Sequence, residues 1–152
     1  MLKKTTILLT ILTLLIPTLA LADEATELKK KIFMDQKKLV VMENMEFTDE
    51  EAKNFWPVYE KYQPKLFESG QQFVEIISSY ASVYKDMKDE KALELVDQFL
   101  DAQQQRQKVM AQYTDALKKV LPGKKVFRCI QLESKLEAIA RFEMAKQIPL
   151  AE

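Results

Sequence analysis

The chain has 152 residues with 23 basic and 23 acidic side chains, no histidine, one cysteine and only two glycines. The lack of histidine excludes Ser-His and Cys-His nucleophilic mechanisms, the usual zinc ligand sets and the Glu-x-x-His di-iron motif. A single cysteine excludes an intramolecular disulfide, a c-type haem attachment and a Cys-x-x-Cys redox pair. The balanced charge, without a long block of one sign, does not indicate a nucleic-acid surface, and we expect no cofactor.

The first 22 residues have the pattern of an export signal. Lys3 and Lys4 give a positively charged start, residues 7–16 form a mostly apolar run of ten, and residues 20–22 match a small-x-small cleavage site. A run of ten residues is too short to span a bilayer, which takes about twenty apolar residues. Residue 23 is Asp rather than Cys, which argues against a lipid anchor. We expect cleavage after Ala22 and a periplasmic chain of residues 23–152, forming one all-helical domain without a membrane span.

The first predicted helix covers residues 25–46. Good helix formers dominate the chain, and the scarcity of glycine disfavours the many tight turns of a β-sandwich or barrel. One apolar stripe of this helix is predicted to face the core of the protein, and the lysines lie mostly outside this stripe. The stripe comprises Leu28, Ile32, Leu39, Met42 and Met45.

The second predicted helix runs to about residue 86 and starts at a capping box. Thr48 can accept a hydrogen bond from the backbone near Glu51, and Glu51 can reach back to the Thr48 N–H. Pro57 and Pro64 each remove a helical hydrogen bond, so we expect a bend there, and the sequence leaves open whether Pro57 splits the helix. Beyond Tyr62 the apolar residues keep a heptad spacing, with Ser69 in a gap, which implies packing on another long helix.

The third predicted helix covers residues 89–120. Its expected core residues are Leu93, Val96, Leu100, Met110, Tyr113 and Leu117. Residues 103–107, Gln-Gln-Gln-Arg-Gln, place polar groups where two core positions should be. Two interpretations are open, a solvent-facing stretch and a dedicated polar binding site, and the periodicity favours the first.

The fourth predicted helix covers residues 124–147, after a stop at Pro122 and Gly123. Glu137 and Arg141 are spaced for an i,i+4 ion pair. Cys129 shares a face with apolar residues and is expected to be buried, although a lone thiol could also cross-link a dimer. Two helices longer than thirty residues predict an elongated bundle of four helices in long hairpins, forming a thin homodimer.

An export signal, a helical body and the motif at residues 47–51 together resemble the Spy/CpxP-like periplasmic proteins. Their LTxxQ motif occurs twice; here Phe47 stands for the Leu and Glu51 for the Gln, and residues 87–91 occupy the second position without the Thr. The resemblance implies a thin, curved helical dimer that binds unfolded or stress-exposed envelope proteins without ATP. We therefore expect a non-enzymatic, chaperone-like envelope stress protein.

An aromatic cluster follows the first motif and is the predicted client-binding site. It consists of Phe55, Trp56, Tyr59 and Tyr62. The helical spacing of Phe55, Tyr59 and Tyr62 equally describes a core face, whereas Trp56 lies off that line beside Pro57 and is expected to be exposed.

Two other functions remain open. A metal-responsive or metal-buffering protein could offer the thioethers of Met42 and Met45 to Cu(I), a soft ion, with carboxylates nearby. A structural partner of a single envelope complex would bind one protein tightly. An enzyme is not expected, because the paired carboxylates lie at helix starts, where capping explains them.

Overall fold

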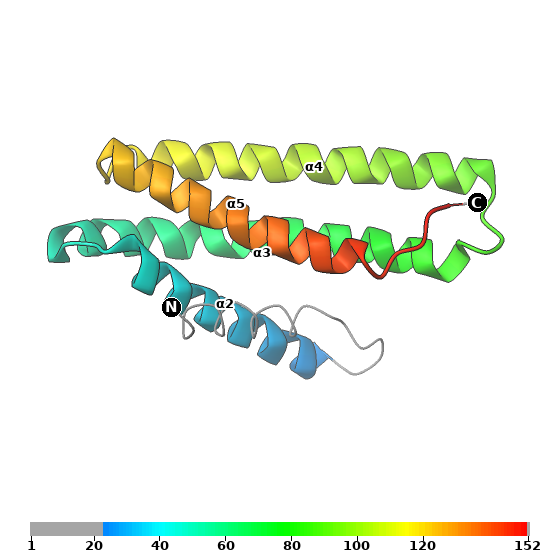
Figure 1. Ribbon diagram of the computed structural model, residues 1–152, viewed down its shortest axis with the longest axis horizontal. Coiled ribbons are helices and arrows are strands. Elements are labelled where there is room, and N and C mark those ends of the chain that lie inside the picture. Colours follow the sequence, from blue (N-terminus) through cyan, green and yellow to red (C-terminus); the bar gives the residue numbers. More distant parts are fainter. Residues whose placement is uncertain (1–22, 152) are drawn as a thin grey trace. The chain divides into compact units, whose positions relative to one another are not determined.

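The computed structural model describes residues 23–151, with side chains from Glu27 on, and within these residues the protein is all-α (Figure 1). Its helices are α2 (Asp23–Met45), α3 (Asp49–Val83), α4 (Asp89–Leu117) and α5 (Gly123–Ala145). The prediction of four helices without strands is therefore confirmed for the described residues. The predicted export signal, residues 1–22, lies outside them. No helix in the described part of the chain is long and apolar enough to cross a bilayer.

The helix starts are where the sequence signals place them. α3 begins at Asp49, directly after Thr48, and α4 begins at Asp89 with Asp89 and Glu90 in its first turn. These acidic side chains interact favourably with the positive end of the helix dipole. α5 begins at Gly123, directly after Pro122. Short local signals in the sequence thus mark where these three helices begin.

The two prolines lie inside α3, which continues through both of them for 35 residues. Pro57 therefore does not split the helix. A helix of this length is about 52 Å long, and it is the longest of the described elements. α4 has 29 residues, slightly fewer than the sequence predicted.

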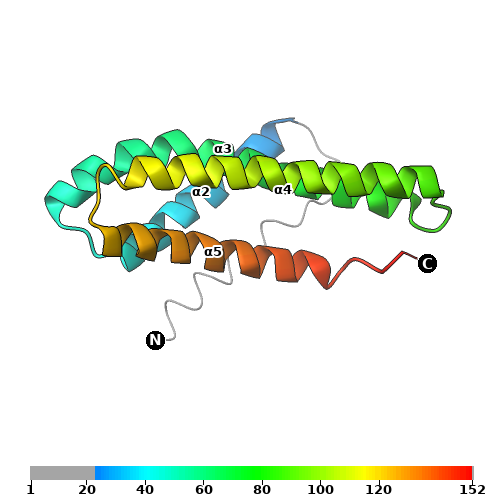
Figure 2. The same ribbon diagram turned by 90° about the horizontal axis from the view of Figure 1, so that it is seen from above.

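The described chain divides into two compact units, and the larger is a helical hairpin of α3 and α4. The two helices run side by side from the turn at residues 84–88 (Figures 1 and 2). The ring of Tyr62 lies 5.6 Å from that of Tyr113, and Phe73 meets Phe99 edge-on at 5.7 Å. The heptad-type spacing of α3 is therefore used for packing against α4.

A polar contact joins the middle of this hairpin. Ser69, the gap in the α3 heptad, is buried and donates a hydrogen bond to the Leu66 carbonyl. The Arg106 guanidinium donates to the same carbonyl at 3.0 Å and to the Ser69 hydroxyl at 3.1 Å. The four glutamines around Arg106 are exposed, as predicted. Arg106 is the exception, because it occupies a core-facing position and finds its partners on α3.

The other unit consists of α2 and α5 with the segment that follows α2, residues 23–49 and 123–147 in the described part. Lys37 and Glu133 form a buried ion pair between the helices, with 2.6 Å between Nζ and Oε2. At the end of α2, Lys125 donates to the carbonyls of Met45 and Glu46, and Arg128 pairs with the Glu46 carboxylate at 2.8 Å. Polar contacts thus fix both the middle and one end of this helix pair.

Two residues on α5 match their predictions. Cys129 is buried with a free thiol. Arg141 pairs with Glu137 at 2.9 Å, one helical turn away. A buried thiol is not positioned to cross-link two chains.

The predicted buried stripe of α2 is wrong at Leu28, Leu39 and Met42, which are exposed, and correct at Met45. α2 carries a second apolar row at Val40 and Val41, and that row is buried instead. The same buried face of α2 also carries Lys37, which the sequence analysis placed off the core. The burial of a lysine is tolerated because Glu133 on α5 supplies an opposite charge at hydrogen-bonding distance.

The predicted core of α4 is wrong in its first half. Leu93, Val96 and Leu100 are exposed, whereas Tyr113 and Leu117 are buried as predicted. The face that packs is instead the one carrying Leu95, Ala102, Arg106 and Tyr113. On that face, Ala102 is a small residue and the ring of Tyr113 packs on the ring of Tyr62 of α3.

Candidate functional site

The aromatic cluster predicted to bind clients is largely a packed core. Phe55 is 0% exposed and Tyr59 is 2% exposed, while Trp56 and Tyr62 are half-buried. The rings of Phe55, Trp56 and Tyr59 lie 5.0–5.5 Å apart from one another. Tyr62 stacks at a tilt on Tyr113. The structure therefore brings Phe55, Trp56 and Tyr59 together, whereas Tyr62 packs on α4. The expectation that Trp56 is exposed is wrong, because its ring packs edge-on against Phe55 and Tyr59 and is half-buried.

The two methionines of the copper hypothesis are in different environments. Met42 is exposed, whereas Met45 is fully buried at the end of α2. Two thioethers bind one soft ion only when both sulfurs are open to it. Within the described residues, no group of three or more histidine, cysteine, aspartate or glutamate side chains is arranged to hold a metal ion.

An exposed apolar stripe runs along the first half of α4. Leu93, Val96 and Leu100 are 66%, 51% and 56% exposed. Their spacing of three and four residues places them on one side of the helix, nearly opposite the packed face that carries Leu95 and Ala102. Single exposed leucines are common on protein surfaces, but three in one row form a continuous apolar surface. We call Leu93, Val96 and Leu100 the α4 stripe.

A row of carboxylates lies directly beside the α4 stripe. Glu90, Glu94, Asp97 and Asp101 recur at intervals of four, three and four residues, so they also line up along α4. All four are exposed. Glu94 accepts hydrogen bonds from Lys91 and Gln98. We call these four residues the acidic row.

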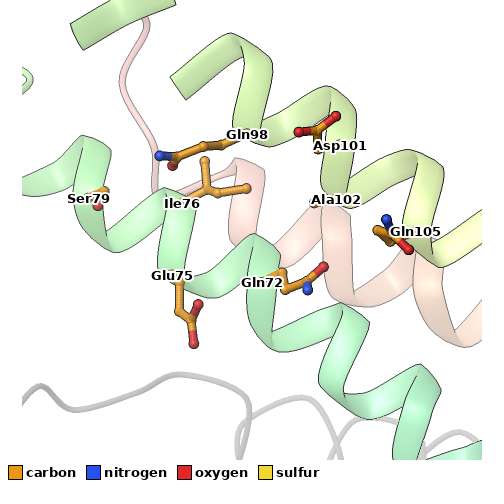
Figure 3. A pocket seen from close by; sticks show the side chains of 8 residues that line it. All are labelled: Gln72, Glu75, Ile76, Ser79, Gln98, Asp101, Ala102 and Gln105. Carbon is orange, nitrogen blue, oxygen red and sulfur yellow. The ribbon is translucent and has the colours of Figure 1, made fainter. Parts of the chain in front are cut away.

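A polar groove lies between α3 and α4, on the far side of the acidic row from the stripe. It encloses about 430 Å³ and is open to solvent. In Figure 3, Ile76 points from α3 toward α4 and Gln98 extends over it, whereas Glu75 points away from α4. The lining comprises Gln72, Glu75, Ile76, Ser79, Gln98, Asp101, Ala102 and Gln105. Such amide-rich walls can hydrogen-bond polar groups of a partner, and Asp101 connects the groove to the acidic row.

Sequence reasoning missed this surface because it assigned the leucines of the α4 stripe to the core. The acidic row was visible in the sequence as four carboxylates with helical spacing. An apolar row beside charged residues is also the usual pattern of a helix that packs on the core of its own protein, so local pattern alone does not separate the two cases.

The chain was compared with known protein families, with curated proteins and with solved structures, and none of the three comparisons gives a match.

Proposed function

We propose that this chain is a non-enzymatic, exported protein that binds other proteins in the manner of a chaperone, as the Spy/CpxP-like proteins do. The export pattern of residues 1–22 and the motif at residues 47–51 support the periplasmic location and the family resemblance. The observation that carries the proposal is the α4 stripe, three exposed apolar side chains in one row on a long helix. The dimer expected from the sequence belongs to the same proposal.

The size of the stripe favours weak and reversible binding. Complete burial of an exposed leucine or valine contributes about 1.5–3 kcal/mol, and these three side chains are already partly covered. Association costs about 4 kcal/mol or more in lost rigid-body freedom, which offsets much of that gain. Weak binding releases a client without ATP, which an exported protein lacks.

Suppression of aggregation tests the proposal. The purified protein should slow the aggregation of a chemically unfolded client without ATP. The variant Leu93→Ser/Leu100→Ser should lose most of this effect, because it makes the α4 stripe polar. The matched control is Phe127→Ser/Phe142→Ser, which removes two exposed apolar side chains from α5.

The control variant should keep the wild-type effect, and both variants should show the helical circular dichroism of the wild type. If the wild-type protein is folded and has no effect on any client, general chaperoning is wrong. Tight binding of one envelope protein, with indifference to generic clients, would instead support the structural-partner alternative.

A further inference from the structure

We propose that the α4 stripe and the acidic row together bind a basic amphipathic helix of another protein. This inference rests on the proposed function and specifies the chemistry of the segment that is bound. The partner segment carries an apolar row that covers Leu93, Val96 and Leu100, and beside it a row of lysine or arginine that meets the four carboxylates.

The geometry of α4 places the two rows in parallel. At about 100° and 1.5 Å per residue, the acidic row lies roughly 60–120° around the helix from Leu100 and extends over about 16 Å. The α4 stripe extends over about 10 Å on the same three turns. A partner helix of three turns therefore reaches both rows at once.

The charge of the acidic row is mostly not compensated within the protein. Glu94 pairs with Lys91 at 2.9 Å. Among the residues that the structure describes, no lysine or arginine forms an ion pair with Glu90, Asp97 or Asp101. Three free carboxylates along one edge of an apolar stripe repel an acidic partner and attract a basic one.

A second copy of this chain fits the surface poorly. An antiparallel pair of α4 helices in contact through their stripes would bring the acidic row of one copy against that of the other. A parallel pair would bring the row against the opposite edge of the stripe, where Ala92, Phe99 and Gln103 carry no positive charge. Like charges disfavour the antiparallel pair, and the parallel pair leaves the acidic row without an opposite charge, so neither arrangement complements this face as a basic partner does.

Lysine and arginine also suit this surface because of their stems. Their methylene groups extend the apolar contact along the edge of the stripe, while the charged ends reach the carboxylates. The amide side chains of Gln98 and Gln105, on the groove side of Asp101, add hydrogen-bonding groups that accept more than one partner sequence. The surface is therefore selective for a class of helix and tolerant of its exact sequence.

The test uses synthetic helical peptides of three heptads as probes. One peptide has a leucine row flanked by lysines, its twin has glutamates in place of the lysines, and a third is a scramble of the lysine peptide without the leucine row. Binding to the purified protein is measured by fluorescence anisotropy. We expect the lysine peptide to bind at least about tenfold more tightly than either of the others.

Salt separates the charge contribution from the apolar one. Raising the salt from about 0.1 M to about 1 M shortens the screening length from about 10 Å to about 3 Å. The preference for lysine over glutamate should therefore collapse, while the residual affinity for the leucine row remains. Equal binding of the lysine peptide and its scramble would overturn the proposal, because it would show attraction to charge alone.

Variants locate the interaction on α4. Asp97→Asn/Asp101→Asn should weaken the binding of the lysine peptide about tenfold. The glutamate peptide should bind this variant as tightly as the wild type or more tightly. The matched control, Glu60→Gln/Glu68→Gln, removes the same charge from α3 away from the groove and should bind the lysine peptide as the wild type does. Loss of binding in both variants to the same degree would contradict a specific acidic row.

The aggregation assay distinguishes this inference from the proposed function. Wild-type suppression without any preference for the lysine peptide would overturn the inference and leave the proposed function standing. A preference for the lysine peptide that Asp97→Asn/Asp101→Asn abolishes, from a protein that suppresses no aggregation, would support the inference and overturn general chaperoning.

Discussion

The ammonium of Lys37 lies 2.6 Å from the carboxylate of Glu133, and both side chains are buried between α2 and α5. A buried ion pair stabilises a fold only when the attraction exceeds the cost of removing both charges from water. Its two members are 96 residues apart in the sequence, and they join the first described helix to the last. The pair therefore connects α2 to α5 across most of the described sequence.

Loss of one member of this pair should be more harmful than loss of both. Lys37→Met leaves the Glu133 carboxylate buried without its ammonium, and we expect a decrease of about 3–5 kcal/mol in the free energy of unfolding. Lys37→Met/Glu133→Leu should recover most of that decrease, because two apolar side chains replace the charges. Urea denaturation measures both values. Lys31→Met, which breaks the exposed pair with Asp35, is the control and should not change the midpoint.

Removal of the Arg106 guanidinium should weaken the hairpin of α3 and α4. Arg106→Met loses charge-assisted hydrogen bonds to the Leu66 carbonyl and the Ser69 hydroxyl, and we expect a loss of about 1.5–3 kcal/mol. Lys108→Met, an exposed change on the same helix, should stay within about 0.5 kcal/mol of the wild type. Thermal unfolding followed by circular dichroism compares the two. Equal stability of the two variants would show that the Arg106 contacts contribute nothing.

The residue after α2 should favour glycine. Glu46 has a φ of 50°, in the left-handed region that ends many helices and that side chains with a Cβ adopt at a cost. Glu46→Gly and Glu46→Ala both remove the carboxylate that pairs with Arg128. Their difference therefore isolates the backbone, and we expect Glu46→Gly to be about 1–2 kcal/mol more stable than Glu46→Ala. An alanine variant as stable as the glycine variant in urea denaturation would contradict this.

The starts of α3, α4 and α5 could be predicted because they depend on local chemistry, whereas α3 and α4 end at Val83 and Leu117, about three residues before the predicted ends. Thr48 before α3, the acidic first turn of α4 and Pro122 before α5 act within a few residues of the boundary they set. The continuity of α3 through Pro57 could not be predicted, because it depends on contacts along the whole helix.

The buried faces could be predicted only in part. When a helix has two apolar rows, contacts with the partner helix decide which row is buried. α2 buries Val40 and Val41 rather than Leu39 and Met42, since this orientation brings Lys37 to Glu133. α4 buries Leu95 rather than Leu93 and Leu100, and this orientation brings Arg106 to Ser69 and Tyr113 to Tyr62 on α3. These same choices bring the candidate surface to the outside of α4, where the sequence had assigned a core.

The contact between Arg106 and Ser69 also determines the axial register of the hairpin. Two long apolar helix faces can slide past each other by one heptad, about 10 Å, and still match apolar residues with apolar residues. Such a slide would place the guanidinium beside Ile76 or beside Tyr62 in place of Ser69. One off-pattern residue on each helix thus distinguishes a single alignment along the helix axis from its near equivalents one heptad away.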